Sequence, residues 1–293
     1  MMPQVALFVD HLAELGEGPG WDAAAQRLYW VDIYGQALHL FTPASGLHRI
    51  IPMPAKIGCA VPKTSGGMLV ALQNGLFTLD LDSEMLTAIA DPEAGLPHNR
   101  FNDGKCDPRG RFLAGTMDDR EIGIAAGSLY SVEADLSIRR LFDGVTISNG
   151  IGFSPDHKTM YYIDSPTRLV VAFDYDLETG DVRNRRIVVT IPEGWGDPDG
   201  MTTDTEGMLW VALWSGESVT RWNPATGELL ERIPVPALNV SSCTFGGPEM
   251  NELFLTTARK GTDPATLAKY PKTGAVFRHK TNVVGMENFV FAG

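Results

Sequence analysis

Four polar residues recur at the same place relative to short apolar stretches of the sequence. Each lies about ten or eleven residues before such a stretch, and the four are Glu17, Asn102, Asn149 and Asp199. In a radial repeat, residues at equal phase lie at equal height around one axis, so their side-chain oxygens would converge. Converging carboxylates repel each other and lose hydration unless a cation lies between them. The residue types therefore predict a divalent-metal centre with Glu17, Asn149 and Asp199 as its ligands.

The identity of the metal stays open. Carboxylate and carboxamide oxygens suit Ca, Mg or Mn, and a site with three protein ligands also suits Zn or Fe(II) because it leaves positions for water and substrate. Taken singly, Glu17, Asn149 and Asp199 each precede a glycine, which is more typical of a turn residue than of a ligand. Their recurrence in phase favours the metal site over three unrelated turns.

The elements that would position these residues form a repeat. A polar or glycine-bearing segment, an apolar strand, a turn and two alternating strands recur six times at intervals of about 42 to 49 residues. Residues 28–32 and 208–212 are rich in Tyr, Trp and Val, which favour strands. We predict an all-β fold, a six-bladed β-propeller with four antiparallel strands per blade and a central channel, and one domain over residues 1–293. A β-sandwich would not explain the repeated unit.

Two local features refine this prediction. We expect residues 5–9 to pair with the last unit and close the ring, because the repeat is otherwise left with an open edge. Residues 263–269 carry the only helical pattern, which would form one or two turns within a loop.

Composition excludes several partners. The formal net charge of -12 disfavours nucleic acid and anionic lipid surfaces. No apolar run reaches the roughly 20 residues that cross a bilayer, and the opening residues do not resemble a signal peptide. We expect a soluble, cytoplasmic protein that is a monomer or a weak homodimer.

Cysteine and histidine chemistry is disfavoured. Cys59, Cys106 and Cys243 are widely spaced and are expected to be reduced apolar fillers, and only His98 is near enough to activate Cys106. The six histidines fall singly in different units, and no G-x-S-x-G elbow occurs, which disfavours a serine hydrolase. The run GEGPG at residues 16–20 lacks the spacing of a dinucleotide-binding loop.

Five ordered segments resemble one known family. They are LGEGPGWD, RFNDGKCDPRGRFLAGTM, SNGIGFSPDHKTMYYIDSPTR, DPDGMTTDTEGMLWVALW and NVSSCTFGGPEMNELFLTTA. They resemble the senescence-marker-protein/gluconolactonase/regucalcin family, and the resemblance covers nearly the whole chain, in order. The resemblance implies a six-bladed propeller with one divalent metal on Glu17, Asn149 and Asp199, and in many members the hydrolysis of sugar lactones.

The resemblance also implies residues that contact substrate. Arg100 and Asn102 match the family's Arg-Phe-Asn motif and would face the sugar hydroxyls and ring oxygen, whereas a surface salt bridge is the alternative for Arg100. Some members place an acidic residue after the Gly-Thr-Met motif against substrate, and here Asp119 or Glu121 would fill that role, unless this acidic loop is merely solvated. Trp195 and Trp214 would lie near the rim, where blade packing is the more usual role of tryptophan than stacking on a sugar.

These features together predict a metal-dependent lactonase that converts a small sugar lactone to its acid, with Asp199 as general base. The alternatives are a calcium-binding protein without catalysis, a hydrolase of another lactone or ester, and a propeller that serves as a protein-interaction platform.

Overall fold

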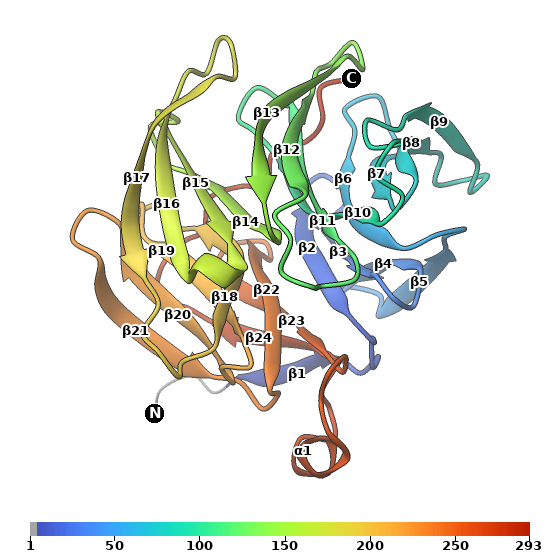
Figure 1. Ribbon diagram of the computed structural model, residues 1–293. Helices are drawn as coiled ribbons and strands as arrows, with labels where there is room; N and C mark the ends of the chain where they lie inside the picture. Colours follow the sequence, from blue (N-terminus) through green and yellow to red (C-terminus); the bar gives the residue numbers. More distant parts are fainter. Residues whose placement is uncertain (1–4) are drawn as a thin grey trace.

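The computed structural model describes residues 5–293 and consists of six four-stranded antiparallel sheets arranged around a common axis (Figure 1). The first blade contains β2 (Gly16–Asp22), β3 (Arg27–Asp32), β4 (Ala37–Thr42) and β5 (Leu47–Pro52). The second contains β6 (Ile57–Pro62), β7 (Met68–Leu72), β8 (Gly75–Leu79) and β9 (Leu86–Ala90). The third contains β10 (Asn99–Cys106), β11 (Phe112–Asp118), β12 (Gly127–Val132) and β13 (Ile138–Val145).

The fourth blade contains β14 (Ser148–Phe153), β15 (Thr159–Asp164), β16 (Leu169–Tyr175) and β17 (Val182–Thr190). The fifth contains β18 (Asp197–Thr203), β19 (Leu209–Trp214), β20 (Ser218–Asn223) and β21 (Glu228–Pro234). The sixth contains β22 (Asn239–Gly246), β23 (Glu252–Ala258), β24 (Val276–Lys280) and, from the other end of the chain, β1 (Ala6–Val9). The predicted six-bladed β-propeller is confirmed.

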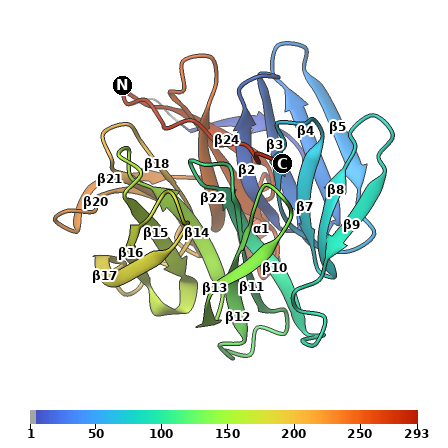
Figure 2. The same cartoon turned by 90° about the horizontal axis from the view of Figure 1, so that it is seen from above.

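The ring closes where the two ends of the chain share one sheet. Strand β1 pairs antiparallel with β24, with Ala6 opposite Arg278, so the expected role of the N-terminal segment is confirmed. Each innermost strand also contacts the innermost strands of the neighbouring blades, in chain order around the ring (Figure 2). Closure removes the open edge that a linear stack of sheets would leave.

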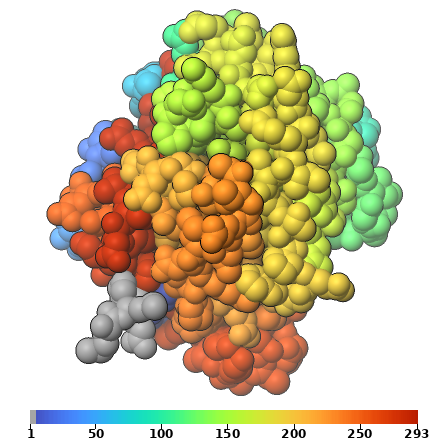
Figure 3. Space-filling model, turned by 90° about the vertical axis from the view of Figure 1, so that its left-hand side faces the viewer, coloured from blue at the N-terminus to red at the C-terminus, as the bar shows by residue number. Residues whose placement is uncertain are grey.

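Apolar side chains fill the spaces between neighbouring blades. Between the first and sixth blades, Trp21 stacks on Phe254 with ring centroids 5.7 Å apart. Between the fifth and sixth blades, Trp210 meets Phe245 edge-on at 5.7 Å. Aromatic residues suit these positions because their large flat surfaces fill the gap between twisted sheets. Figure 3 shows the outer face where the fourth and fifth blades, yellow to orange, lie side by side.

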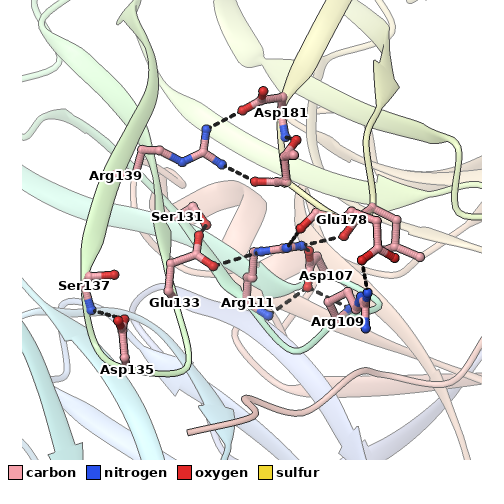
Figure 4. A network of polar contacts seen from close by, with 12 residues as sticks. Asp107, Arg109, Arg111, Ser131, Glu133, Asp135, Ser137, Arg139, Glu178 and Asp181 are labelled. Carbon is pink, nitrogen blue, oxygen red and sulfur yellow. Dashed lines mark hydrogen bonds and ion pairs between the residues drawn. The ribbon is translucent and has the colours of Figure 1, made fainter.

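A polar network ties the third blade to the fourth (Figure 4). Asp107, which follows β10 and is wholly buried, accepts hydrogen bonds from Arg111 Nη1 at 2.8 Å and from Tyr175 Oη at 2.5 Å. Arg111 Nε also donates to Glu133 at 2.9 Å, and Nη2 donates to the Glu178 carbonyl at 2.5 Å. The network therefore holds the turn before β11 against the turn after β16.

The single α-helix among residues 5–293 is α1 (Pro264–Lys269), which projects below the blades in Figure 1 and confirms the expected helical turns. Asp263 caps it by accepting the backbone N–H groups of Ala265 and Thr266. Within the same described range, no helix has the length and apolar character needed to cross a bilayer.

The predicted environment is confirmed for the cysteines but is wrong for the histidines. Cys59, Cys106 and Cys243 are free and buried, as expected. The expectation that the histidines lie singly in different units is wrong, because the β4–β5 hairpin brings His39 Nδ1 within 3.0 Å of His48 Nε2. The segment before β2 adds His11, whose ring centroid lies 4.6 Å from that of His39.

Candidate metal and substrate site in the central channel

A cavity of about 220 Å³ lies at one end of the central channel, where the innermost strands begin. The predicted residues Glu17, Arg100, Asn102, Asn149 and Asp199 all line it, and they come from β2, β10, β14 and β18. These residues are distant in the sequence, and the closed ring alone brings them together. The remaining lining residues are Leu15, Met117, Glu121, Ile147, Ser165, Pro166, Asp197, Trp214 and Lys260.

A β-bulge near the start of every innermost strand positions the site residues. The register with the second strand shifts in all six blades, at residues 18–19, 58, 102–103, 150, 199–200 and 241. A bulge interrupts the strict in-and-out alternation of a strand and re-aims the side chains beside it. Glu17, Asn102, Asn149 and Asp199 lie in or next to these bulges, which explains why the four share one phase.

Glycine at one bulge permits a close approach of two blades. A Cβ atom on Gly150 would lie 2.7 Å from the backbone oxygen of Asp199, closer than side-chain atoms come in proteins. The absence of a side chain therefore lets β14 approach β18, and Asn149 and Asp199 reach the same cavity.

Two buried carboxyl groups, those of Glu17 and Asp199, line the cavity, and the carboxyl group of Asp103 lies near them. Glu17, Asp103 and Asp199 are 5%, 7% and 5% exposed, and none of the ion pairs formed by residues 5–293 involves them. Burial, reinforced by the charge of Asp103, raises the pKa of Glu17. Burial and the neighbouring charge of Glu17 raise the pKa of Asp199 well above its usual range. Lys105 partly offsets the charge of Asp103, whereas Glu17 and Asp199 form no ion pair among residues 5–293 and are costly to ionise without a cation.

The donor set fits a hard divalent metal. Among residues 5–293, no group of three or more His, Cys, Asp or Glu side chains has a metal-binding arrangement, so a centre here needs the Asn149 carboxamide as well as Glu17 and Asp199. Two carboxylates and one carboxamide are oxygen ligands, and the unbalanced negative charge beside them attracts a cation.

Arg100 and Asn102 are held rigidly at the wall of the cavity. Arg100 is 2% exposed, which rules out the alternative of a surface salt bridge. Its Nε donates to Asp119 at 2.7 Å and its Nη1 donates to Asn102 Oδ1 at 2.6 Å. Asn102 Nδ2 in turn donates to the oxygen of Asn149 at 3.0 Å. The residues assigned to metal and to substrate therefore belong to one hydrogen-bond network.

The two acidic candidates after the Gly-Thr-Met segment lie in different environments. Asp119 does not line the cavity; it accepts hydrogen bonds from Arg100, from Lys56 at 2.5 Å and from Tyr34 at 3.3 Å. Its partial burial opposes ionisation, yet Lys56 and Arg100 lower its pKa. Glu121 lines the cavity and forms an ion pair with Lys260. Asp119 thus supports Arg100, and Glu121 is the one exposed to a ligand.

The two tryptophans that were predicted near the rim lie in different environments. Trp195 packs against the core of the fourth and fifth blades, and the Arg232 guanidinium lies 4.4 Å from its ring centroid. Trp214 lines the cavity and also packs against a buried cluster that contains residues of the first two blades together with Ala258 of β23. Blade packing is therefore the role of Trp195, whereas Trp214 offers the cavity an apolar face.

Several polar residues in or beside this site were not predicted from the sequence, among them Asp103, Ser165 and Lys260. Asp103 directly follows Asn102 in the bulge of β10, and a bulge is not visible as an alternation pattern. Ser165 belongs to a short 3₁₀ turn, η1 (Ser165–Thr167), after β15, and its side-chain hydrogen bonds are both long-range. Lys260 follows β23 and reaches the cavity only because the ring closes.

Residues 15–259 match the family described as the SMP-30/Gluconolactonase/LRE-like region. A regucalcin of Danio rerio is 41% identical over 266 residues, which are 90% of each chain.

Two solved structures share the fold throughout. A luciferin-regenerating enzyme superposes with a TM-score of 0.93 and 32% identity over 99% of this chain and 100% of its own. A calcium-binding protein, regucalcin, from Agrobacterium tumefaciens superposes with a TM-score of 0.94 and 29% identity over 99% of this chain and 98% of its own.

Proposed function

We propose that this chain, which belongs to the SMP-30/gluconolactonase/LRE-like family, hydrolyses a small sugar lactone with the help of one divalent metal ion. The observation that carries the proposal is the convergence in one cavity of Glu17, Asn149 and Asp199, which suit a cation, with Arg100 and Asn102, which suit a polyol. A site that only stored a cation would have no use for a buried guanidinium beside it.

In this proposal Glu17, Asn149 and Asp199 hold the metal, with Ca, Zn, Mn, Mg and Fe(II) as the candidate ions. When bound, the metal supplies positive charge that polarises the lactone carbonyl and stabilises negative charge on its oxygen. The same positive charge opposes the rise in the pKa of Asp199 that burial and Glu17 cause.

Asp199 is the proposed general base. A water molecule that attacks the lactone carbonyl carbon must lose a proton, and a carboxylate oxygen of Asp199 accepts it. The carbon–oxygen bond to the ring oxygen then breaks, and the proton returns to that oxygen to give the hydroxyl of the open acid. Asp199 is 5% exposed, so bulk water has little access to its carboxyl group.

Arg100 and Asn102 orient the substrate in this proposal. Arg100 is fixed by Asp119 and Asn102, so its guanidinium does not lose much conformational freedom when a sugar hydroxyl binds. Holding the ester carbon near the attacking water is a positioning effect that lowers the barrier by several kcal/mol, of the order of what bound geometry supplies in enzymes. Trp214 and Leu15 give the cavity an apolar side that suits the C–H face of a sugar ring.

A panel of five- and six-membered sugar lactones, assayed for acid release with Ca, Mg, Mn, Zn or Fe(II), tests this function. We expect turnover that depends on added metal and is lost in Asp199→Asn, whereas Arg100→Ala mainly raises KM. Wild-type turnover by Asp199→Asn would remove Asp199 from the role of base. Turnover that persists in the presence of a strong chelator would show that the reaction does not depend on a metal.

The second candidate is a calcium-binding protein that does not catalyse, because two of the similar proteins carry the name regucalcin and one is described as calcium-binding. The same experiment separates the two candidates. Binding of Ca to the wild-type protein in calorimetry, without acid release from any lactone with any of the metals, would favour this second function.

A further inference from the structure

A chain of hydrogen bonds crosses the site from the third blade to the fifth. It runs from Arg100 through the side chains of Asn102, Asn149 and Ser165 to the backbone carbonyl of Pro198, the residue before Asp199. Every bond in it is between 2.6 and 3.0 Å long. The chain therefore connects the segments that carry two of the proposed metal ligands.

The end at Pro198 fixes the orientation of Asn149. A carbonyl only accepts, so Ser165 Oγ uses its single proton in the 2.7 Å bond to the Pro198 oxygen. Ser165 Oγ must then accept in its 2.8 Å bond to Asn149, and only Nδ2 of Asn149 can donate there. Asn149 Oδ1 consequently points away from Ser165.

The end at Arg100 gives the same answer independently. A guanidinium only donates, so Asn102 must present Oδ1 to Arg100 Nη1, which lies 2.6 Å away. Asn102 Nδ2 then donates to the Ser148 carbonyl at 2.8 Å and to Asn149 Oδ1 at 3.0 Å. Asn149 Oδ1 has two lone pairs, and this bond occupies one of them. The other remains available to a cation.

The serine is itself held firmly. Ser165 is 7% exposed, and its backbone N–H donates to the Ile147 carbonyl at 3.2 Å. Asp164, the residue before it, accepts the Ile147 N–H at 2.9 Å. The η1 turn is thereby tied to the start of β14, one residue before Ser148 and two before Asn149.

We infer that Ser165 is a positioning residue for the proposed metal site: its hydroxyl keeps the carboxamide of Asn149 turned so that oxygen, and not the NH₂ group, faces the cation. The inference rests on the proposed function for the metal but not on catalysis. Without the hydroxyl, the bond from Asn102 Nδ2 is the one side-chain hydrogen bond among residues 5–293 left to hold the Asn149 carboxamide, so its oxygen is held toward the cation less firmly. Partners that orient a ligand typically change metal affinity by about 10- to 100-fold.

Calorimetric titration of the metal-free protein with Ca and with Mn tests this role. Ser165→Ala should bind each ion about 10- to 100-fold more weakly than the wild type. Ser165→Thr, which keeps the hydroxyl, and Thr167→Ala, which removes a hydroxyl from the same turn outside the chain, should bind within about twofold of it. Thermal unfolding of each metal-free variant checks that the fold is retained.

A double-mutant cycle separates orientation from general damage. In an Asn149→Asp background both side-chain oxygens are equivalent, so a half-turn changes nothing, and Ser165→Ala should now weaken binding by less than about threefold. An equally large loss in both backgrounds would overturn the positioning role, as would an unchanged affinity of Ser165→Ala. If the wild-type protein binds neither ion, the proposed metal site is wrong and the inference fails with it. If the wild-type protein binds an ion tightly, the affinities of the variants test the role of Ser165 alone.

Discussion

Glu121 and Lys260 form an ion pair across the mouth of the channel. Glu121 follows β11 in the third blade and Lys260 follows β23 in the sixth, and these blades face each other because the six blades follow chain order around the ring. The Lys260 ammonium also lies 4.7 Å from the ring centroid of Tyr34, which follows β3 in the first blade. Side chains from three blades thus meet over the cavity.

Removal of this bridge should widen the entrance. We predict that Lys260→Ala increases kcat/KM for bulky aryl or acylated lactones relative to the smallest sugar lactones. Its free energy of unfolding should change by less than about 1 kcal/mol, because the pair is partly exposed. Competition kinetics with small and bulky lactones measures the ratio. Lys269→Ala, which removes a comparable pair with Glu217 outside the cavity, is the control, and equal ratios in both variants would contradict the prediction.

Gly150→Ala should disturb the site without filling it. The new Cβ would meet the backbone oxygen of Asp199 at 2.7 Å, so β14 and β18 must move apart and carry Asn149 and Asp199 with them. We expect weaker metal binding and lower lactonase activity, measured by calorimetry and acid release. Gly95→Ala has open space around its Cβ and should match the wild type. Normal metal affinity in Gly150→Ala would show that the close approach is unimportant.

Glu17→Gln should stabilise the metal-free protein and weaken metal binding. Burial and the nearby Asp103 make the ionised form of Glu17 unfavourable, and a neutral isostere relieves this. We expect the free energy of unfolding to rise by about 0.5–2 kcal/mol, the range of common stabilising substitutions. Urea denaturation in the presence of a chelator measures the first effect, and calorimetry measures the second. A variant that is less stable and binds metal normally would show that Glu17 is structural.

Asp107→Ala should be strongly destabilising. It leaves the Arg111 guanidinium and the Tyr175 hydroxyl without their buried acceptor, and breaking a buried ion pair typically costs about 3–5 kcal/mol. Arg139→Ala removes a neighbouring but exposed pair with Asp181 and should cost less than about 1 kcal/mol (Figure 4). Urea denaturation of both variants gives the comparison, and similar losses would show that the buried network contributes no more than the surface pair.

Stability should fall with acidification because of His39. Burial, with the charges of His11 and His48, lowers its pKa to about 3 in the folded protein, against about 6.5 in an unfolded chain. Between these values the unfolded chain binds the additional proton. The free energy of unfolding therefore decreases as the pH falls below about 6.5, by about 1.4 kcal/mol per pH unit for this one group.

The measurement is urea denaturation at several pH values between about 7 and 5. His39→Phe keeps a ring against Trp30 and should show a shallower pH dependence than the wild type. An unaltered slope in His39→Phe would assign the pH dependence to other groups.

The fold could be predicted because the sequence repeats one structural unit six times. Alternation of apolar residues specifies strands locally, and six copies of one unit cannot bury their faces except by packing against each other. Residues at the same position in each repeat lie at the same height along the axis of the ring. For this reason the side chains of Glu17, Asn102, Asn149 and Asp199 line one cavity.

Other features of the site could not be obtained in this way. Asp119 and Glu121 are two residues apart in one loop, yet one turns toward Arg100 and Lys56 and the other toward Lys260. Their order in the sequence carries no information about this, because the partners belong to different blades. The cluster of His39 and His48 was missed for a related reason, since strand register decides which residues of a hairpin face each other.

The sequence by itself determined the number of blades, the closure by the N-terminal strand and the level at which oxygen-bearing side chains gather, because periodicity and phase are local properties that survive folding unchanged. Only the tertiary structure decided which way each side chain turns. The bulges, the contact of Gly150 with β18 and the bond from Ser165 to the Pro198 carbonyl join segments that are remote in the chain, and their geometry exists only after the ring has closed.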